Sequence, residues 1–368
     1  MKSSPSRLLN RIETAIGEAA TPLIADCLRA ERACYLARQG RVDEAKSAIA
    51  ALRRQYGSTP NVAMSAWLSL AEGLESYFRN LGAGSRDKVL RAQALSAAAG
   101  LVPMQALSSA WLSQMDFTKL DVESMARNAR QALKLAAAND SSARGRASLV
   151  LAQSLHVARR FDLALPWYRR AHAHATAQGD DATVSAFMHN MTCMRSDNLR
   201  QVKLTGLGDE NDIDIVQTGS ESTGRFDELI GASSLKAINP LLRARILSLQ
   251  GRPAEALVLY EEHISVDVDQ SFSRMKSDLL SDVAWCQIQL DQRESAVASA
   301  IAAEENLVAD TQIDDRAATH TRLSWLYLSV GDSEAAQRHE MLASQAWGTY
   351  VQLQERIVQL LEDVSENG

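Results

Sequence analysis

One phrase recurs along this chain and constrains its fold more than any other feature. "LSLQGRPAEALVLYEEH" begins at Leu247, and related phrases begin at Leu36, Leu155 and Leu326. Each holds an apolar stretch, a short polar break and an alanine five residues after the break. The pairs of break residue and alanine are Gly40 and Ala45, Arg159 and Ala164, Gly251 and Ala256, Asp291 and Ala296, and Gly331 and Ala336. Such repetition predicts an array of similar units.

The clearest copy indicates two helices joined by a tight turn. Before the break, apolar residues three or four apart form one helical stripe: Leu242, Ile246 and Leu249. Gly251 suits the left-handed conformation that ends a helix, and Pro253 suits the first turn of the next one. Ala256 and Tyr260 are four apart, so they share the face that turns back onto the first helix.

A small residue also stands seven positions before each break: Ala33, Ala152, Ala244, Ala284 and Ser324. Small side chains on both helices let the two backbones approach closely. Each hairpin still leaves one apolar face uncovered, which only a neighbouring hairpin can bury. The sequence therefore predicts an all-α solenoid of about seven stacked hairpins, without a β-sheet of consequence.

These positions resemble the tetratricopeptide repeat (TPR) pattern, which places small residues at helix crossings and an aromatic four residues after the second alanine. The best match is Ala152, Ala164, Tyr168 and Ala171, followed by Ala244, Ala256 and Tyr260. Ala256, Ala296 and Ala336 are 40 residues apart, whereas the family's usual period is about 34. The longer spacing is similar to that of divergent TPR arrays in bacterial regulators.

The pattern divides the chain into five segments. We expect an N-terminal helix over 1–20, basic hairpins over 21–203, a loop over 204–224, acidic hairpins over 225–343 and a C-terminal capping or coiled-coil helix over 344–368. The loop is predicted because "LTGLGDENDIDIVQTGSESTG" is polar, acidic and rich in glycine, with an irregular or strand-like piece at "DIDIV".

Composition points to the cytoplasm. No apolar run reaches the ~20 residues that cross a bilayer, and the first twenty residues lack the pattern of a signal peptide. Cys27 and Cys34 are seven apart on one predicted helix, about 10 Å along its axis, which is too far for a disulfide. We expect all four cysteines to be reduced.

Charge is distributed unevenly along the chain. Residues 1–200 contain 26 Lys and Arg against 17 Asp and Glu, whereas residues 201–368 contain 13 against 28. Solvated helix faces explain such a distribution, and so does a charged partner or head-to-tail association. Nucleic acid is a poor candidate partner because the arginines are not interleaved with stacking aromatics.

The sequence carries no catalytic, cofactor or metal motif. The seven histidines form no metal-binding pair of the HExxH type, and "DENDID" lacks the central glycine and terminal glutamate of a calcium loop. The glycines of "NLGAGSRDK" are not followed by the GK[ST] of a phosphate-binding loop. We therefore predict a protein that is not an enzyme and has no cofactor.

In TPR arrays the first helices of the hairpins line a concave groove. The resemblance places Arg146, Leu149, Gln153, His156, Leu241, Arg245, Ser248, Asp278, Ser281, Trp285, Gln289, Thr321, Trp325 and Leu328 there. Trp285 and Trp325 are one 40-residue period apart, so they point the same way. Either they anchor a ligand in the groove or they pack between hairpins. The lysine–asparagine clamp by which some TPR co-chaperones hold a carboxylate is not present at these positions.

The C-terminal segment predicts one long amphipathic helix. Its apolar seam is Ala343, Ala346, Tyr350, Leu353, Ile357, Leu360 and Val364. This seam can cap the final hairpin, near Trp325 and Tyr327, or pair with a second copy. Acidic flanks such as Glu355 and Glu362 disfavour a parallel pair, which favours a monomer.

Two functions remain open at the level of sequence. The first is a scaffold or adaptor that binds a segment of another protein in the groove. The second is a regulatory sensor that binds a peptide or small ligand and relays it to an output protein. The length and helical lead-in are similar to those of TPR peptide-receptor regulators, but the fold itself does not determine function.

Overall fold

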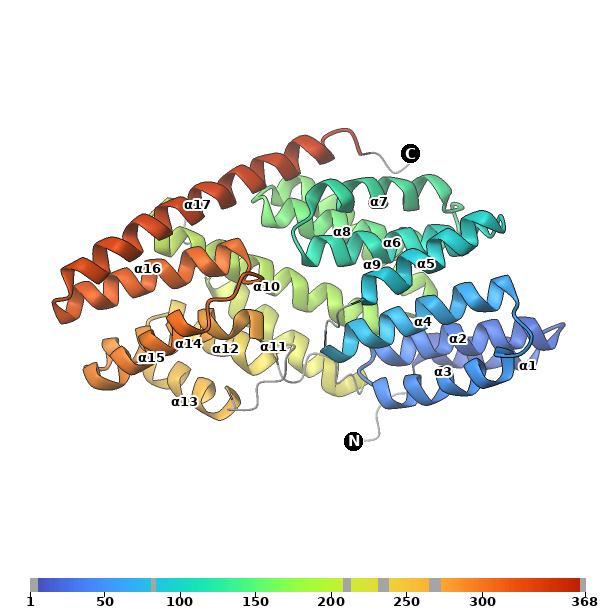
Figure 1. The fold of residues 1–368 in the computed structure, drawn as a ribbon, viewed down its shortest axis with the longest axis horizontal. Coiled ribbons are helices and arrows are strands. Elements are labelled where there is room, and N and C mark those ends of the chain that lie inside the picture. Colours follow the sequence, from blue (N-terminus) through green and yellow to red (C-terminus); the bar gives the residue numbers. More distant parts are fainter. Residues whose placement is uncertain (1–5, 81–83, 208–212, 231–237, 265–272, 365–368) are drawn as a thin grey trace.

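A computed structural model describes residues 6–80, 84–207, 213–230, 238–264 and 273–364. These residues form helices and no strand (Figure 1). None of the described helices combines the length and the apolar character needed to cross a bilayer. The helices are α1 Arg7–Gly17, α2 Pro22–Arg38, α3 Val42–Tyr56, α4 Val62–Asn80, α5 Ser85–Ala98, α6 Val102–Thr118, α7 Val122–Leu135, α8 Ser141–Val157, α9 Phe161–Gln178, α10 Asp181–Thr205, α11 Ile213–Ile230, α12 Asn239–Leu249, α13 Pro253–His263, α14 Ser273–Gln289, α15 Arg293–Glu305, α16 Ile313–Val330 and α17 Ser333–Leu361.

Within the described ranges, α2 to α17 pair into eight successive hairpins, and α1 precedes the first. Each hairpin stacks on the next along the length of the molecule, from the blue helices to the orange helices of Figure 1. The predicted TPR-like α-solenoid is confirmed, with one hairpin more than the sequence suggested. The helix predicted over 1–20 is α1.

The repeated breaks have one backbone conformation. Gly40, Gly251 and Gly331 have φ values of 83°, 74° and 88°, and Arg159 and Asp291 adopt the same left-handed region at 58° and 59°. Left-handed backbone costs a residue with a Cβ more than it costs glycine. Its presence at all five breaks shows that the turn geometry of the hairpin decides the conformation, and it confirms the register of the repeat.

The alanines after the breaks lie at the helix crossings, as predicted. Ala45, Ala164, Ala256 and Ala296 are fully buried and Ala336 is 5% exposed. A larger side chain at such a crossing has no space.

We therefore expect Ala164→Leu or Ala256→Leu to lower the free energy of unfolding by about 1–3 kcal/mol, because added methyl groups overpack a close contact. Urea unfolding followed by circular dichroism checks this. Glu221→Gln, at an exposed position of α11, is the control and should be nearly neutral. An equal loss in the control would contradict the register.

The loop predicted over 204–224 is wrong where the structure describes it. Helix α10 continues to Thr205, and residues 213–224 belong to α11; residues 208–212 lie outside the described residues. The glycines mark close packing here, since a Cβ on Gly219 would lie 2.7 Å from the Thr192 hydroxyl of α10. Thr223, which the loop would leave exposed, is buried. The strand-like piece is likewise helical from Ile213 onward.

The C-terminal helix differs from its prediction in two respects. It begins at Ser333 instead of residue 344, because it is the second helix of the last hairpin. It has 29 residues against 18 in α16, so it spans about 43 Å against about 27 Å. The seam beyond the end of α16 therefore needs another surface to cover it.

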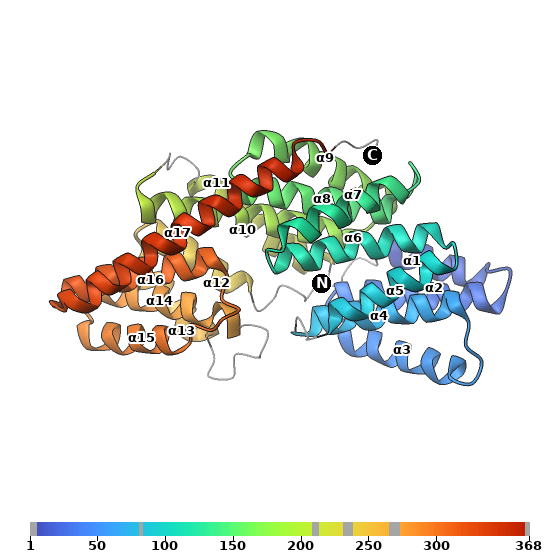
Figure 2. The same cartoon turned by 45° about the horizontal axis from the view of Figure 1, so that its top comes forward.

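That surface belongs to the middle of the solenoid. Tyr350, Ile357 and Leu361 join the core built by α7, α8 and α9, and Gln354 donates to the Val157 carbonyl oxygen at 2.7 Å. Figures 1 and 2 both show α17 crossing over to this region. The expectation that the seam packs near Trp325 and Tyr327 is therefore wrong for its C-terminal half.

Candidate binding site on the inner helices

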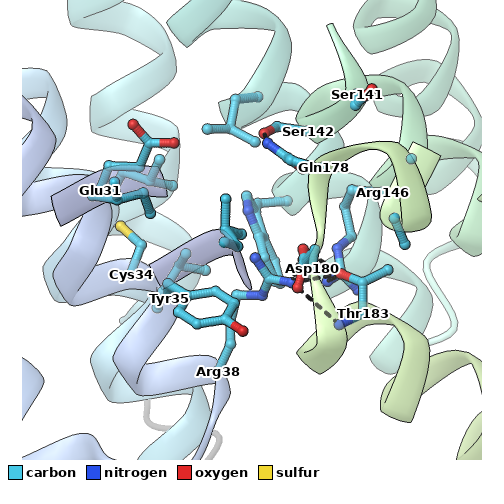
Figure 3. A pocket seen from close by; sticks show the side chains of 18 of the residues that line it. Glu31, Cys34, Tyr35, Arg38, Ser141, Ser142, Arg146, Gln178, Asp180 and Thr183 are labelled. Carbon is cyan, nitrogen blue, oxygen red and sulfur yellow. Dashed lines mark hydrogen bonds and ion pairs between the residues drawn. The ribbon is translucent and has the colours of Figure 1, made fainter. Parts of the chain in front are cut away.

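The first helices of the N-terminal hairpins surround a cavity of about 50 Å³. Helices α2, α4, α6 and α8 form most of its wall, and α1, α9 and the start of α10 complete it (Figure 3). At 10–15 Å³ for each water molecule, this space holds roughly four. We call it the N-terminal cavity. It is too small for a folded partner but large enough for a side chain or a chain end.

Contacts between α1–α2 and α9–α10 close the cavity. Arg38 pairs with Asp180 and also donates to the Thr183 hydroxyl at 2.5 Å. Leu8 donates its backbone N–H to the Gly179 carbonyl oxygen at 3.1 Å. Asp180 also caps α10 by accepting from the Thr183 backbone N–H at 3.0 Å. Burial alone would raise the pKa of Asp180, but Arg38 lowers it below its usual value.

Arg146 is the unusual member of this cavity. Its side chain stacks on the Trp111 ring, with the guanidinium carbon 4.2 Å from the ring centroid. It donates to the Thr183 hydroxyl at 3.3 Å, and no carboxylate among the described residues forms an ion pair with it. Burial, followed by the nearby Arg38, lowers the pKa of Arg146 to about 9. Arg146 is thus a buried cation with one hydrogen bond, to Thr183, among the described residues.

A second cavity, of about 140 Å³, lies between α10, α12, α14 and α16. We call it the C-terminal cavity. Its apolar wall includes Leu241 and Leu279, and its polar wall is Asp197, Arg245, Arg274, Gln312, Asp314 and Asp315. Both cavities therefore face the first helices of the hairpins, which is the side that the sequence assigned to a groove.

A buried network of arginines and aspartates forms one side of the C-terminal cavity. Arg200 contacts Asp278 and Asp315 at 2.8 Å each and Asp314 at 3.1 Å. Arg245 pairs with Asp278 and lies 3.2 Å from Asp282. Arg322 of α16 also pairs with Asp282. Buried ion pairs thus link helices α10, α12, α14 and α16.

The acidic members of the network do not all behave alike. Burial alone would raise the pKa of Asp278, but Arg200 and Arg245 hold it below its usual value. Burial, reinforced by Asp278 and Asp314, raises the pKa of Asp315 well above its usual value.

The predicted groove residues fall into three sets: those that line a cavity, those that are buried and those that are partly exposed. Arg146 lines the N-terminal cavity and Arg245 lines the C-terminal cavity. The buried set is Gln153, His156, Asp278, Ser281 and Thr321, of which Asp278 pairs with Arg200. Trp285, Gln289, Trp325 and Leu328 form a partly exposed group, which we call the tryptophan patch.

In the tryptophan patch, the ring centroids of Trp285 and Trp325 are 5.4 Å apart. Trp325 is 37% exposed and Leu328 is 64% exposed. The spacing predicted that the two tryptophans point the same way; in the structure their rings also contact each other, and neither residue is fully buried.

His156 gives a prediction for pH. Its Nδ1 lies 3.0 Å from the Tyr168 hydroxyl, and burial, followed by Arg195, lowers its pKa from 6.5 to about 4. The unfolded chain then binds more protons than the native protein between these two values. The contribution of His156 to stability is full above pH 6.5 and is lost as the pH falls towards 4.

We expect the His156 imidazole to titrate near pH 4 by NMR. Between pH 7 and pH 5 the wild type should lose about 1–2 kcal/mol more stability than His156→Gln, since one pKa unit corresponds to about 1.4 kcal/mol. A midpoint near 6.5, or equal losses in both proteins, would show that the imidazole is not desolvated.

Sequence reasoning missed Arg38, Trp111 and Asp180. The N-terminal hairpins match the repeat pattern weakly, so no inner positions were assigned there. Arg38 and Asp180 are 142 residues apart, and no local pattern signals such a contact. Among the residues that the structure describes, no three His, Cys, Asp or Glu side chains come together as metal ligands.

Comparisons with known proteins support the architecture. No family model matches the sequence, and no curated protein matches it either. A crystal structure of a Rap protein complexed with competence and sporulation factor is similar in fold, with a TM-score of 0.59 and 12% identity over 94% of this chain and 92% of that one. The apo form of RapI gives a TM-score of 0.49 and 10% identity over 93% and 97%. At this identity the first likeness establishes the fold alone.

Proposed function

We propose that the protein is a non-enzymatic adaptor that holds a segment of a partner protein along its inner helices. The observation that carries the proposal is the pair Arg146 and Gln153 on α8. They are seven residues apart, so they share one helix face about 10 Å apart along its axis. Arg146 makes one hydrogen bond to a described residue, Thr183, and the buried Gln153 Oε1 has no hydrogen-bond partner among these residues.

Buried polar groups in native proteins almost always have partners. These two groups suit a ligand that offers an acceptor to Arg146 and, about 10 Å along the helix, a donor to Gln153. Other inner atoms share the property, namely Gln114 Oε1 of α6 and Arg274 Nε of α14. The proposal places the action of the protein in the cytoplasm and favours a monomer.

The tryptophan patch supports the same function. Tryptophan is enriched among residues that dominate binding energy at interfaces. Two tryptophan rings that contact each other at an angle of 56° and keep part of their surface exposed can bind an apolar side chain of the partner.

The test is capture of partners from a lysate of the native cell on full-length protein, followed by mass spectrometry and affinity measurement with the captured partner. We expect Trp285→Ala and Trp325→Ala each to raise Kd about 10- to 30-fold, because a central aromatic contributes about 2 kcal/mol. Their effect on melting temperature should be the smaller effect.

Val258→Ala is the matched control, since Val258 is 61% exposed on α13 and lies on a second helix of a hairpin. It should leave Kd unchanged. Losses of folding with unchanged affinity in the folded fraction would instead assign both tryptophans to structure. Partners that bind all variants equally would remove the inner helices from the proposal.

A regulatory sensor is the second candidate function. The N-terminal cavity lies where α1–α2 close onto α9–α10, so an occupant would contact both sides of that closure. The Rap protein of similar fold is itself complexed with competence and sporulation factor. A small molecule or peptide that copurifies with the protein, detected by native mass spectrometry, would favour this function over the adaptor.

A further inference from the structure

The N-terminal cavity contains a buried cation, Arg146, that forms no ion pair with a described carboxylate. Arg146 is 7% exposed, and its hydrogen-bond partner among the described residues is Thr183. The Trp111 ring covers one flat face of the guanidinium. The N–H donors lie in the guanidinium plane, so stacking leaves them free to donate at the edge.

We propose that the N-terminal cavity is a carboxylate-binding site in which Arg146 holds a single carboxylate of the ligand. A guanidinium presents two parallel N–H groups that match the two oxygens of a carboxylate. The cavity has space for roughly four water molecules, which suits one such group and excludes a longer stretch of chain. The inference rests on the proposed function, because it assigns the cavity to one end or one side chain of the bound segment.

The neighbouring charges select a monoanion. Arg38 is already paired with Asp180, whereas Arg146 forms no ion pair with a described carboxylate. Glu31 lines the opposite side in Figure 3. Burial, followed by Asp140, raises the pKa of Glu31. The two negative charges of a phosphate would exceed the single positive charge of Arg146 and would lie near the carboxyl groups of Glu31 and Asp180. A carboxylate carries one negative charge, which matches the charge of Arg146.

Polar groups at the rim are arranged to accept a ligand. Gln178 donates to the Ser142 hydroxyl at 2.5 Å, and both side chains line the cavity beside Arg146 (Figure 3). The side chains of Ser141, Ser142 and Trp67 keep part of their surface exposed. Part of the cavity wall therefore reaches the protein surface.

The experiment is a titration of the full-length protein with sodium acetate in place of sodium chloride at constant ionic strength. The tryptophans are labelled with ¹⁵N, and the indole N–H signal of Trp111 is assigned from Trp111→Phe. We expect a saturable shift of this signal with Kd of about 1–10 mM, the range open to so small a ligand. In Arg146→Met the shift should be lost or Kd raised at least about tenfold, since a hydrogen bond to a charged group is removed.

Two further variants keep the test decisive. Arg91→Met removes an exposed arginine of α5 and should titrate like the wild type. Arg146→Lys keeps the charge but loses the two-pronged donor geometry, so it should bind a few-fold more weakly; it decides the question if Arg146→Met does not fold. The proposal is overturned by a wild type without a saturable shift up to about 100 mM, or by Arg146 variants that titrate like the wild type.

The source of the carboxylate is settled by two blocked probes. N-acetylglycylglycine offers a terminal carboxylate, and N-acetylaspartate amide offers only a side-chain carboxylate. Tighter binding of the first assigns the cavity to a chain end, and tighter binding of the second assigns it to an acidic side chain. Partner capture by the tryptophan patch is measured separately. Failure of the acetate titration with capture intact therefore rejects this assignment and leaves the proposed function standing.

Discussion

Arg200→Met should lower the free energy of unfolding by about 3–5 kcal/mol, the usual cost of removing one partner from a buried ion pair. Arg200 has a side chain that is 1% exposed and contacts three aspartates from α14 and α16. Methionine fills much of the same volume but leaves Asp278 buried opposite Asp314 and Asp315. The loss is electrostatic, because the packed volume changes little.

Urea unfolding followed by circular dichroism measures this loss. Arg338→Met is the control, since Arg338 and Glu304 have side chains that are 55% and 29% exposed, and such pairs contribute about 0–1 kcal/mol. Adding Asp315→Asn to Arg200→Met should recover part of the stability, because it removes one uncompensated carboxyl group. Equal losses in Arg200→Met and Arg338→Met would contradict the buried network.

Deletion of residues 352–368 should destabilise the middle of the solenoid and lower solubility. The deletion removes Ile357 and Leu361, which are 0% and 5% exposed, and uncovers the core of α7, α8 and α9. Ile357→Ala alone should cost about 2–5 kcal/mol, as for other large-to-small changes in a core. Thermal unfolding checks both variants, and Glu355→Ala at an exposed position should be nearly neutral.

Light scattering measures the oligomeric state of the full-length and truncated proteins. We expect the same monomer before and after truncation, because the seam is covered by the chain's own helices. A dimer in the full-length protein and a well-folded monomer after truncation would reassign the seam to an interface between copies.

The parts of the fold that depend on neighbouring residues were predictable. The break and alanine spacing set the hairpin register, and the left-handed φ at Arg159 and Asp291 shows that the register holds without glycine. The TPR pattern assigned Arg146 and Arg245 to the inner side of the hairpins, and in the structure both residues line cavities. Each of these features depends on helical periodicity alone.

The remaining features depend on contacts between distant segments. Gly219 suggested a loop because its close packing on Thr192 cannot be inferred from local sequence. Arg200 and Asp315 are 115 residues apart, and their pairing requires that α10 and α16 come into contact in the folded chain. The sequence analysis did not predict which surface the C-terminal apolar seam packs against, because no residue near Ile357 in the sequence indicates a contact with α8.

The cover that α17 provides has a consequence for synthesis of the chain. In repeat proteins each unit usually contacts only its neighbours, so early repeats can fold while later ones are still being made. Here Arg356 contacts Glu123 across 233 positions. At ribosomal rates of about 5–20 residues per second, the covering helix emerges roughly 10–50 s after the helices that it covers. During that interval the nascent chain exposes an apolar surface that chaperones can bind, and its middle hairpins reach their final stability only after α17 has been synthesised.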